Sequence, residues 1–313
     1  MMDWTDRHCR YFHRQITRHT WLYTEMVTTG SVIYGDPNRH LDFNQEEHPV
    51  ALQLGGSEPH ELAQCAKLGQ QWGYDEINLN CGCPSERVVR GAFGACLMAE
   101  PTLVADCMKA MRDAVDIDIS VKHRIGIDDV KSYNFVRDFV GTVAEAGCNI
   151  FIVHARNAIL KGLSPKENRE IPPLKYDFVY QLKRDFPKLQ IIINGGFRTV
   201  EEIDTYLVHL DGVMIGREAY HNPWLLSAFD ERYFGDTSQK KLRMQIIEAM
   251  LPYIEAQVAR GGPRMNSIVR HMLGLMSGLR GARLFRQQMS DAKVLACGDP
   301  ALLLHAAQAV VAA

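Results

Sequence analysis

Strand-like apolar runs alternate with helical segments along the first two thirds of the chain, and this order constrains the fold most. Seven runs are rich in β-branched residues and almost continuously apolar: 21–27, 50–56, 76–82, 119–126, 150–156, 190–196 and 212–218. The segments between them with helical periodicity are 58–72, 101–116, 133–146, 176–186 and 200–208. Parallel strands covered on both faces give such runs, so we predict an α/β fold with a parallel sheet.

Polar residues at the ends of these runs favour a (β/α)8 TIM-type barrel. Gln53, Asn80, Lys122, His154 and Asn194 all stand near the end of a strand-like run, and barrel enzymes keep their chemistry at the carboxyl ends of their strands. An open doubly wound sheet would be expected to carry a Gly-x-Gly-x-x-Gly turn, which the sequence lacks. Seven runs are one fewer than such a barrel has, so one strand is expected to be missing from this chain.

The last quarter of the chain differs in pattern and in charge. Strand-like runs give way to helical ones, such as 242–258. Residues 236–313 hold ten Lys or Arg and five Asp or Glu, a formal charge of +5, whereas residues 1–235 carry −7. We predict a barrel domain at 1–235 and a helical domain at 236–313. A basic domain can bind a polyanion, although a solvated helical face accounts for the charge equally well.

Hydropathy and cysteine usage restrict the class of protein. No run approaches the roughly 20 apolar residues of a membrane span, and the first ten residues are polar and charged, unlike a signal peptide. The 8 cysteines are scattered through a long chain without the spacing of a small disulfide scaffold. We expect reduced thiols in a cytoplasmic protein with no membrane partner.

Two glycine-bearing strand ends late in the predicted barrel suggest a phosphate site. They are Asn194-Gly195-Gly196 and Gly216-Arg217. Barrel enzymes often bind phosphate in the loops after the seventh and eighth strands. Glycines let backbone N–H groups approach the phosphate, and an arginine adds a charged donor. A simple turn accounts for the first motif alone, but the pair favours a cofactor that carries phosphate.

Three further side chains suit a flavin. Lys122 and His154 follow consecutive strands and should point into one mouth, and a buried lysine needs a negative or polar partner. Reduced flavin develops negative charge at its N1/O2 edge, where a cation is favourable, and Gln53 could hydrogen-bond the ring. A structural role is the better explanation for a lone histidine, but it explains less well why such residues end separate strands.

The segment 78–85 combines a strand end, a glycine turn, two thiols and Pro84. A thiol at this position can protonate a carbon that has just gained negative charge. Cys81 and Cys83 would share one face of an extended strand, but Gly82 is expected to break the extension and leave only Cys83 facing the mouth. Zinc is disfavoured because the Cys-x-Cys pair has no matching second pair. A redox pair of the two thiols is the other alternative.

Ten stretches of the sequence resemble the tRNA-dihydrouridine synthase family, specifically its A subfamily. They span most of the chain, and the run LSPKENREIPPL is too long to match by chance. The stretches are MMDWTDRHCR, LYTEMVTTG, EEHPVALQLGGS, YDEINLNCGCPSERV, GAFGACLM, VKHRIGIDD, HARNAILKGLSPKENREIPPL, INGG, DGVMIGREAY and VRHMLGL. The resemblance implies an FMN-binding barrel followed by a helical tRNA-binding domain, with NADPH as reductant. No metal is expected, since the Cys-x-Cys pair lacks a second ligand pair.

The resemblance also implies residue roles. Cys83 matches the family's proton donor. Asn80 matches a position that faces the target uridine, and Lys166 and Arg169 match a loop that meets tRNA. The positions that match the flavin site are Met1, Gln53, Lys122, His154, Asn194, Gly195, Gly196, Gly216 and Arg217. Reduced FMN would then pass a hydride to C6 of the uracil ring and Cys83 a proton to C5, with positions 20 and 20a of the tRNA D-loop as targets.

The sequence departs from the family pattern at three places. It starts at what resembles the Met that follows the first barrel strand, so that strand is the one expected to be missing. Cys81 replaces an aliphatic residue, and His123 replaces a small polar one. Two other functions compete with the main hypothesis: a free-pyrimidine flavin reductase of the dihydroorotate dehydrogenase type, and a non-catalytic barrel that only binds tRNA.

Overall fold

The computed structural model describes residues 1–85, 91–130 and 132–311. The chain divides into two compact units. The first, called here the sheet unit, comprises Tyr23–Phe43 and His48–Gly216. The second, the helical unit, comprises Met1–Leu22, Asn44–Glu47 and Arg217–Ala313. The predicted domain boundary between residues 235 and 236 stays a prediction.

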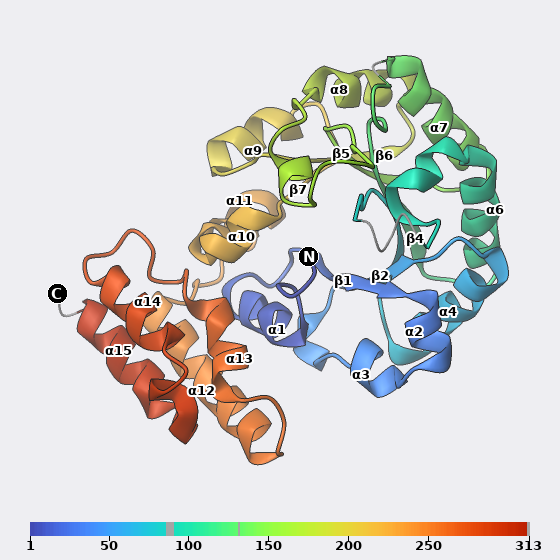
Figure 1. Ribbon diagram of the computed structural model, residues 1–313. Coiled ribbons are helices and arrows are strands. Elements are labelled where there is room, and N and C mark those ends of the chain that lie inside the picture. Colours follow the sequence, from blue (N-terminus) through green and yellow to red (C-terminus); the bar gives the residue numbers. More distant parts are fainter. Residues whose placement is uncertain (86–90, 131, 312–313) are drawn as a thin grey trace. The chain divides into compact units, whose positions relative to one another are not determined.

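One sheet forms the centre of the sheet unit, and its strands follow one another across it in chain order. Seven strands lie in the described part of the chain: β1 (Leu22–Thr28), β2 (Val50–Gly55), β3 (Glu76–Cys81), β4 (Asp118–Arg124), β5 (Ile150–His154), β6 (Gln190–Asn194) and β7 (Gly212–Met214). Pairing from β2 to β7 is parallel throughout. The sheet curls, with helices along its convex side (Figure 1). The predicted barrel-type fold is confirmed, with a strand in each predicted run.

The helices of the sheet unit also follow the predicted segments. They are α2 (Thr29–Tyr34), α3 (Pro37–Leu41), α4 (Pro59–Trp72), α6 (Pro101–Arg112), α7 (Tyr133–Glu145), α8 (Tyr176–Asp185) and α9 (Val200–Leu207), with 3-10 turns η2 (Gly94–Ala99) and η3 (Glu167–Arg169). Proline occupies the first turn of α4 and of α6, where its missing N–H leaves no bond unmade. Gly73, with φ of +96°, ends α4 in a left-handed conformation. The short helices α2 and α3 were not predicted.

The two faces of the sheet differ in polarity. Leu52 and Ile77 point toward α4, because a Cβ built on Gly69 of that helix would meet both side chains within 3 Å. Side chains alternate along a strand, so the neighbouring residues face the opposite, concave side. The register there aligns Gln53 with Asn78 and Asn78 with Ser120. An apolar convex face therefore anchors the helices, while the concave face carries polar groups.

The helical unit combines the start of the chain with its end. Its helices are α1 (Arg7–Ile16), α10 (Arg217–His221), α11 (Phe229–Phe234), α12 (Arg243–Ala259), α13 (Met265–Val269), α14 (Ala282–Ser290) and α15 (Ala301–Val311). Its 3-10 turns are η1 (Gln45–Glu47), η4 (Pro223–Ala228), η5 (Arg270–Met272) and η6 (Val294–Cys297). Phe12 of α1, Ile246 of α12 and Phe285 of α14 are among its fully buried side chains. The inclusion of α1 was not predicted.

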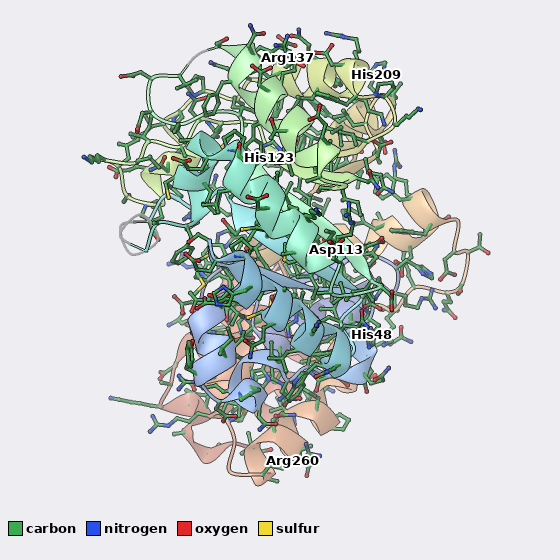
Figure 2. All side chains as sticks on the ribbon, turned by 90° about the vertical axis from the view of Figure 1, so that its right-hand side faces the viewer. His48, Asp113, His123, Arg137, His209 and Arg260 are labelled. Carbon is green, nitrogen blue, oxygen red and sulfur yellow. The ribbon has the colours of Figure 1, made fainter. Side chains whose placement is uncertain are left out.

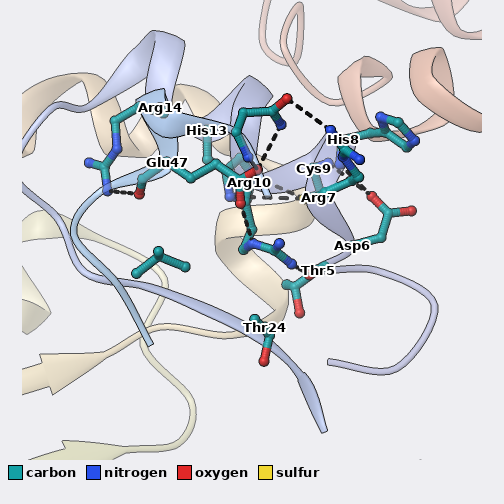
Figure 3. Close-up of polar contacts among 12 residues, drawn as sticks. Thr5, Asp6, Arg7, His8, Cys9, Arg10, His13, Arg14, Thr24 and Glu47 are labelled. Carbon is teal, nitrogen blue, oxygen red and sulfur yellow. Dashed lines mark hydrogen bonds and ion pairs between the residues drawn. The ribbon is translucent and has the colours of Figure 1, made fainter. Parts of the chain in front are cut away.

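Buried polar contacts attach α1 within this unit (Figure 3). Asp6 begins the helix by accepting the backbone N–H groups of His8 and Cys9, each at 3.0 Å. The same carboxylate lies 3.0 Å from Nε2 of His271, a fully buried ring. Nε of Arg10 donates to Glu47 at 2.5 Å. The contact between Asp6 and His271 joins residues 265 apart in the sequence.

Candidate active site

Cys83 lies in a tight turn directly after β3, and Asn80 holds that turn. The Oδ1 atom of Asn80 accepts the backbone N–H groups of Gly82 at 3.0 Å and of Cys83 at 2.9 Å. The carbonyl of Cys83 accepts the N–H of Ala95 at 2.9 Å, and its thiol lies 3.6 Å from the Ser85 hydroxyl. An asparagine side chain that caps its own turn fixes the backbone two and three residues on.

The two neighbouring thiols have different environments. Cys81 is fully buried, close to Cys107 and Cys148, and burial raises its pKa well above the ordinary value. Cys83 is partly exposed. Both are free thiols. The turn at Gly82 therefore leaves only Cys83 accessible, as expected from the sequence, and Cys81 is part of the packed wall.

A chain of amides backs the turn on the concave face. Asn80 donates from Nδ2 to Oε1 of Gln53 at 2.8 Å. Gln53 in turn donates from Nε2 to Oδ1 of Asn78 at 2.8 Å. The side chain of Asn80, predicted to face the target uridine, thus has its oxygen engaged with the turn and its nitrogen with Gln53.

Two cations lie near Cys83. The ammonium group of Lys122 donates to Oδ1 of Asn194 at 3.2 Å, and burial, with a smaller effect of Arg124, lowers its pKa to about 8. Burial also lowers the pKa of Arg124, to about 10. Lys122 pairs in register with Asn80, and Nε of Arg124 donates to the carbonyl of Gly82 at 3.1 Å, so both cations lie beside the Cys83 turn.

Arg124 was missed as a site residue. Its guanidinium donates to the carbonyl of Gly82 at 3.1 Å, and to those of Asn157 and Asn168 at 3.1 and 3.0 Å. It thereby connects the cysteine turn to the loop that holds Lys166 and Arg169. The signal in the sequence was its position two residues after Lys122, which places both side chains on one face of β4.

The ends of β5 and β6 form a close-packed glycine turn. Gly195 and Gly196 have φ values of +124° and +90°, in the region that favours glycine. A Cβ on Gly195 would lie 2.9 Å from the ring of His154, and one on Gly196 would lie 2.8 Å from the Tyr176 hydroxyl. That hydroxyl donates to the carbonyl of Gly195 at 2.7 Å. Packing against the side chains of His154, Leu174 and Tyr176 therefore requires glycine at both positions, and their predicted part in phosphate binding stays a prediction.

The remaining predicted site residues lie on the loop around η3, at the end of the sheet unit and in the helical unit. Lys166 is exposed and Arg169 half-buried, on the loop around η3, which the buried Asn168 fixes through its bonds to Ile159. Gly216 ends the sheet unit. Met1 and Arg217 belong to the helical unit, so their part in a flavin site stays a prediction. Residues 86–88 of the cysteine motif lie outside the described ranges.

His123 has a structural place. It is fully buried, its Nδ1 lies 2.7 Å from the carbonyl of Arg124, and its ring packs against Phe139 of α7 and Phe151 of β5. Burial lowers its pKa to about 4, so the ring is neutral near pH 7. His123 (labelled in Figure 2) is part of the wall that faces the helices and not of the concave surface.

A cavity of about 460 Å³ opens at the carboxyl ends of β1 and β2. Its lining is glycine-rich and includes two carboxylates. The lining residues are Thr28, Thr29, Gly30, Gly55, Gly56, Ser57, Glu58, Glu61, Gly91 and Phe93. The space lies at the same edge of the sheet as the cysteine turn.

Comparison with known proteins gives a family and a fold. The family model described as dihydrouridine synthase (Dus) matches residues 1–311. The chain is 60% identical over 292 residues to tRNA-dihydrouridine(20/20a) synthase of Vibrio parahaemolyticus, covering 93% of this chain and 89% of that protein. It is 57% identical over 311 residues to the protein of the same name from Escherichia coli K12, covering 99% and 90%.

Two solved structures share the fold at low identity. A 2-naphthoyl-CoA reductase complex has a TM-score of 0.55 at 10% identity, covering 74% of this chain and 47% of that one. Morphinone reductase has a TM-score of 0.53 at 11% identity, covering 77% and 83%.

Proposed function

The chain belongs to the dihydrouridine synthase family, and from this premise we propose how its own residues carry out the reaction. The protein is a flavin-dependent oxidoreductase that reduces uridine in tRNA to dihydrouridine, at positions 20 and 20a. The free-pyrimidine reductase and the non-catalytic barrel are both disfavoured, because close relatives over nearly the whole chain are named as enzymes that act on tRNA.

The concave face suits a flavin mononucleotide. The backbone at Gly195 and Gly196 carries no side chain and would let N–H groups approach a phosphate, to which Gly216 and Arg217 would add. Lys122 places a cation at the carboxyl end of β4, where Asn194 orients it. We assign the ring edge to Gln53, Lys122 and His154, and Met1 stays a predicted flavin-binding residue. When bound, FMN supplies the hydride that C6 of the uracil ring accepts.

Cys83 supplies the proton that C5 of the same ring needs to complete the reduction. Hydride at C6 and a proton at C5 together saturate the C5=C6 double bond, and the sulfur is left as a thiolate that solvent reprotonates. Lys122 pairs in register with Asn80 and Arg124 donates to the carbonyl of Gly82, so both cations lie beside the Cys83 turn, where their charge would favour a thiolate. The Cys83 turn, fixed by Asn80 beside these two cations, is the observation that carries this assignment.

Binding of tRNA requires a positively charged protein surface, and the reaction requires the target base to leave the folded tRNA. We propose that Lys166 and Arg169 meet the tRNA near the barrel mouth and that the basic segment 236–313 binds its backbone. The target base must turn out of its stack to reach Cys83, as other base-modifying enzymes require. The helices in the described residues are all too short or too polar to span a bilayer. NADPH as reductant and a cytoplasmic location complete the proposal.

The two thiol variants test the proposal. The purified enzyme, loaded with FMN, is incubated with NADPH and tRNA that lacks dihydrouridine, and the product is measured by mass spectrometry of the digested RNA. Cys83→Ala should keep flavin binding, tRNA binding and NADPH oxidation but lose product formation by about a hundredfold or more. Cys81→Val is the matched control, because an aliphatic side chain suits the packed wall. If Cys81→Val lost product formation and Cys83→Ala kept it, Cys83 would not be the proton donor and the proposal would be wrong.

A further inference from the structure

A line of hydrogen bonds crosses the concave face from the Cys83 turn to Glu76 at the other end of β3. It continues the amide chain described above: Nδ2 of Asn78 donates to the Ser120 hydroxyl at 2.6 Å, and this hydroxyl donates to Oε1 of Glu76. Asn78 and Ser120 have no exposed surface, and Glu76 is 4% exposed. The chain therefore runs through the protein interior, with bonds between three adjacent strands.

At each end of this chain of hydrogen bonds, the terminal group can only donate or only accept. The backbone N–H groups of Gly82 and Cys83 can only donate, and an ionised carboxylate can only accept. Each link between them consequently has one possible orientation, in which Asn80, Gln53, Asn78 and Ser120 all donate toward Glu76. A protonated Glu76 that donated to Ser120 would leave the Ser120 proton without its acceptor, since Asn78 already donates to that oxygen.

The surroundings of Glu76 suit this role. Tyr23 of β1 donates a second hydroxyl to its Oε1 at 3.0 Å. Burial raises the pKa of Glu76, and the hydrogen bonds from Ser120 and Tyr23 oppose that rise. Asp118, at the exposed start of β4, acts on Glu76 through charge alone. Two hydroxyl donors directed at a buried carboxylate satisfy it as an acceptor.

We propose that Glu76 is a positioning residue for the reaction: it sets the orientation of the side chains from Ser120 to Asn80 and so holds the turn that presents Cys83. The inference rests on the proposed function of Cys83 and assigns a role to residues behind the site. Glu76 does not touch the reacting atoms. It acts through Gln53, which also has a predicted place at the flavin edge, and through Asn80, which caps the turn.

Two substitutions break the chain of hydrogen bonds while they change the side-chain volume only slightly. Ser120→Ala deletes the hydroxyl that joins Asn78 to Glu76. Glu76→Gln keeps the shape but adds an NH₂ group, which can donate to Ser120 and reverse the chain up to Asn80, where the backbone N–H groups oppose the reversal. Asp118→Asn is the matched control, because it removes the neighbouring carboxylate and leaves every link in place.

The first measurement is the alkylation rate of Cys83 by iodoacetamide in the FMN-loaded enzyme, read peptide by peptide by mass spectrometry. In Ser120→Ala and in Glu76→Gln, Cys83 should react at least about threefold faster, because the Asn80 side chain no longer holds the turn in one position. Cys297, an exposed thiol in η6 of the helical unit, is the internal reference and should react as in the wild type. Asp118→Asn should match the wild type at both thiols.

The second measurement separates the two half-reactions. Reduction of the bound flavin by NADPH should change by less than about twofold, whereas transfer from the pre-reduced enzyme to tRNA should slow by about tenfold to a hundredfold. A purely structural role would lower the melting temperature and leave both the Cys83 alkylation rate and the ratio of the half-reactions unchanged, and that result overturns the inference. If either Ser120→Ala or Glu76→Gln does not fold, the other variant alone provides the test. If wild-type enzyme fails to modify tRNA, the proposed function fails, and the alkylation rates alone decide this inference.

Discussion

Replacing Asp6 by alanine should destabilise the helical unit far more than loss of an ordinary helix cap. The Asp6 carboxylate has two structural roles. It accepts the N–H groups of two residues at the start of α1, and it is the acceptor for the buried His271 and for Arg270. Alanine at this position removes both at once. The connection between the start of the chain and η5 then loses its central group.

The magnitude follows from the separate contacts. Loss of the cap costs about 1 kcal/mol. A fully buried His271 without its acceptor costs about 1 to 3 kcal/mol more. Arg270 is 42% exposed at its side chain and adds less than about 1 kcal/mol. The free energy of unfolding should therefore fall by about 2 to 5 kcal/mol in Asp6→Ala.

Urea unfolding of the full chain, followed by circular dichroism, measures this change. Asp299→Ala is the matched control, since Asp299 is exposed and accepts the backbone N–H of Ala301 at the start of α15 at 2.9 Å. That variant should lose only about 1 kcal/mol. Asp6→Asn should fall between the two, because asparagine caps well but carries no charge. Equal losses in Asp6→Ala and Asp299→Ala would refute the reasoning.

The same carboxylate predicts a pH dependence. Burial would raise the pKa of Asp6, but the hydrogen bond and charge of His271, with smaller effects of Cys9 and Arg270, outweigh it and hold the pKa well below its ordinary value. A folded-state pKa below the unfolded value of about 4 contributes stability above that pH, and the contribution is lost as the pH falls. The difference between the wild type and Asp6→Asn should accordingly shrink when unfolding is measured at pH 3 instead of pH 7.

Three further predictions concern the cofactor and the RNA. Lys122→Ala should weaken FMN binding about tenfold, measured by flavin fluorescence during dialysis, and unchanged retention would remove this lysine from the site. Gly195→Ala should lose FMN and lower the melting temperature, because its Cβ would meet the ring of His154; a variant with wild-type absorbance at the visible flavin bands would contradict this. Charge reversal at the exposed Arg280, Arg283 and Arg286 should weaken tRNA binding and reduce the slope of log K against log salt by about 2 to 3. An unchanged slope would mean that these arginines are a solvated face.

The sheet could be predicted because buried parallel strands leave a strong pattern. The run Ile150–Val153 is apolar without interruption, as is typical of a parallel strand covered on both faces. Pro59 and Pro101 marked helix starts for an equally local reason. The short helix α2 was missed because its six residues are too few to show a period.

The site was predictable where chemistry and position coincide, as at Cys83 and Lys122. The function of Asn80 in holding the turn could not be separated from contact with the substrate, since both place an amide at a strand end. Glu76 and Ser120 gave no signal, because a buried carboxylate is recognised only by the donors that surround it. The pairing of Asp6 with His271 joins positions 265 apart, and neither residue has a local pattern that indicates the other.

The composition of the helical unit from both ends of the chain has a consequence for synthesis on the ribosome. The segment Met1–Leu22 is made before residues 23–216, yet its partners in α12 and η5 come only after them. At about 5 to 20 residues per second, this delay lasts roughly 10 to 40 s. During that interval α1 lacks its contacts with α12, η4 and η5. The segment Met1–Leu22 is thus translated before the sheet unit but completes its packing after it, and chaperones that bind short apolar segments have their opportunity in the interval.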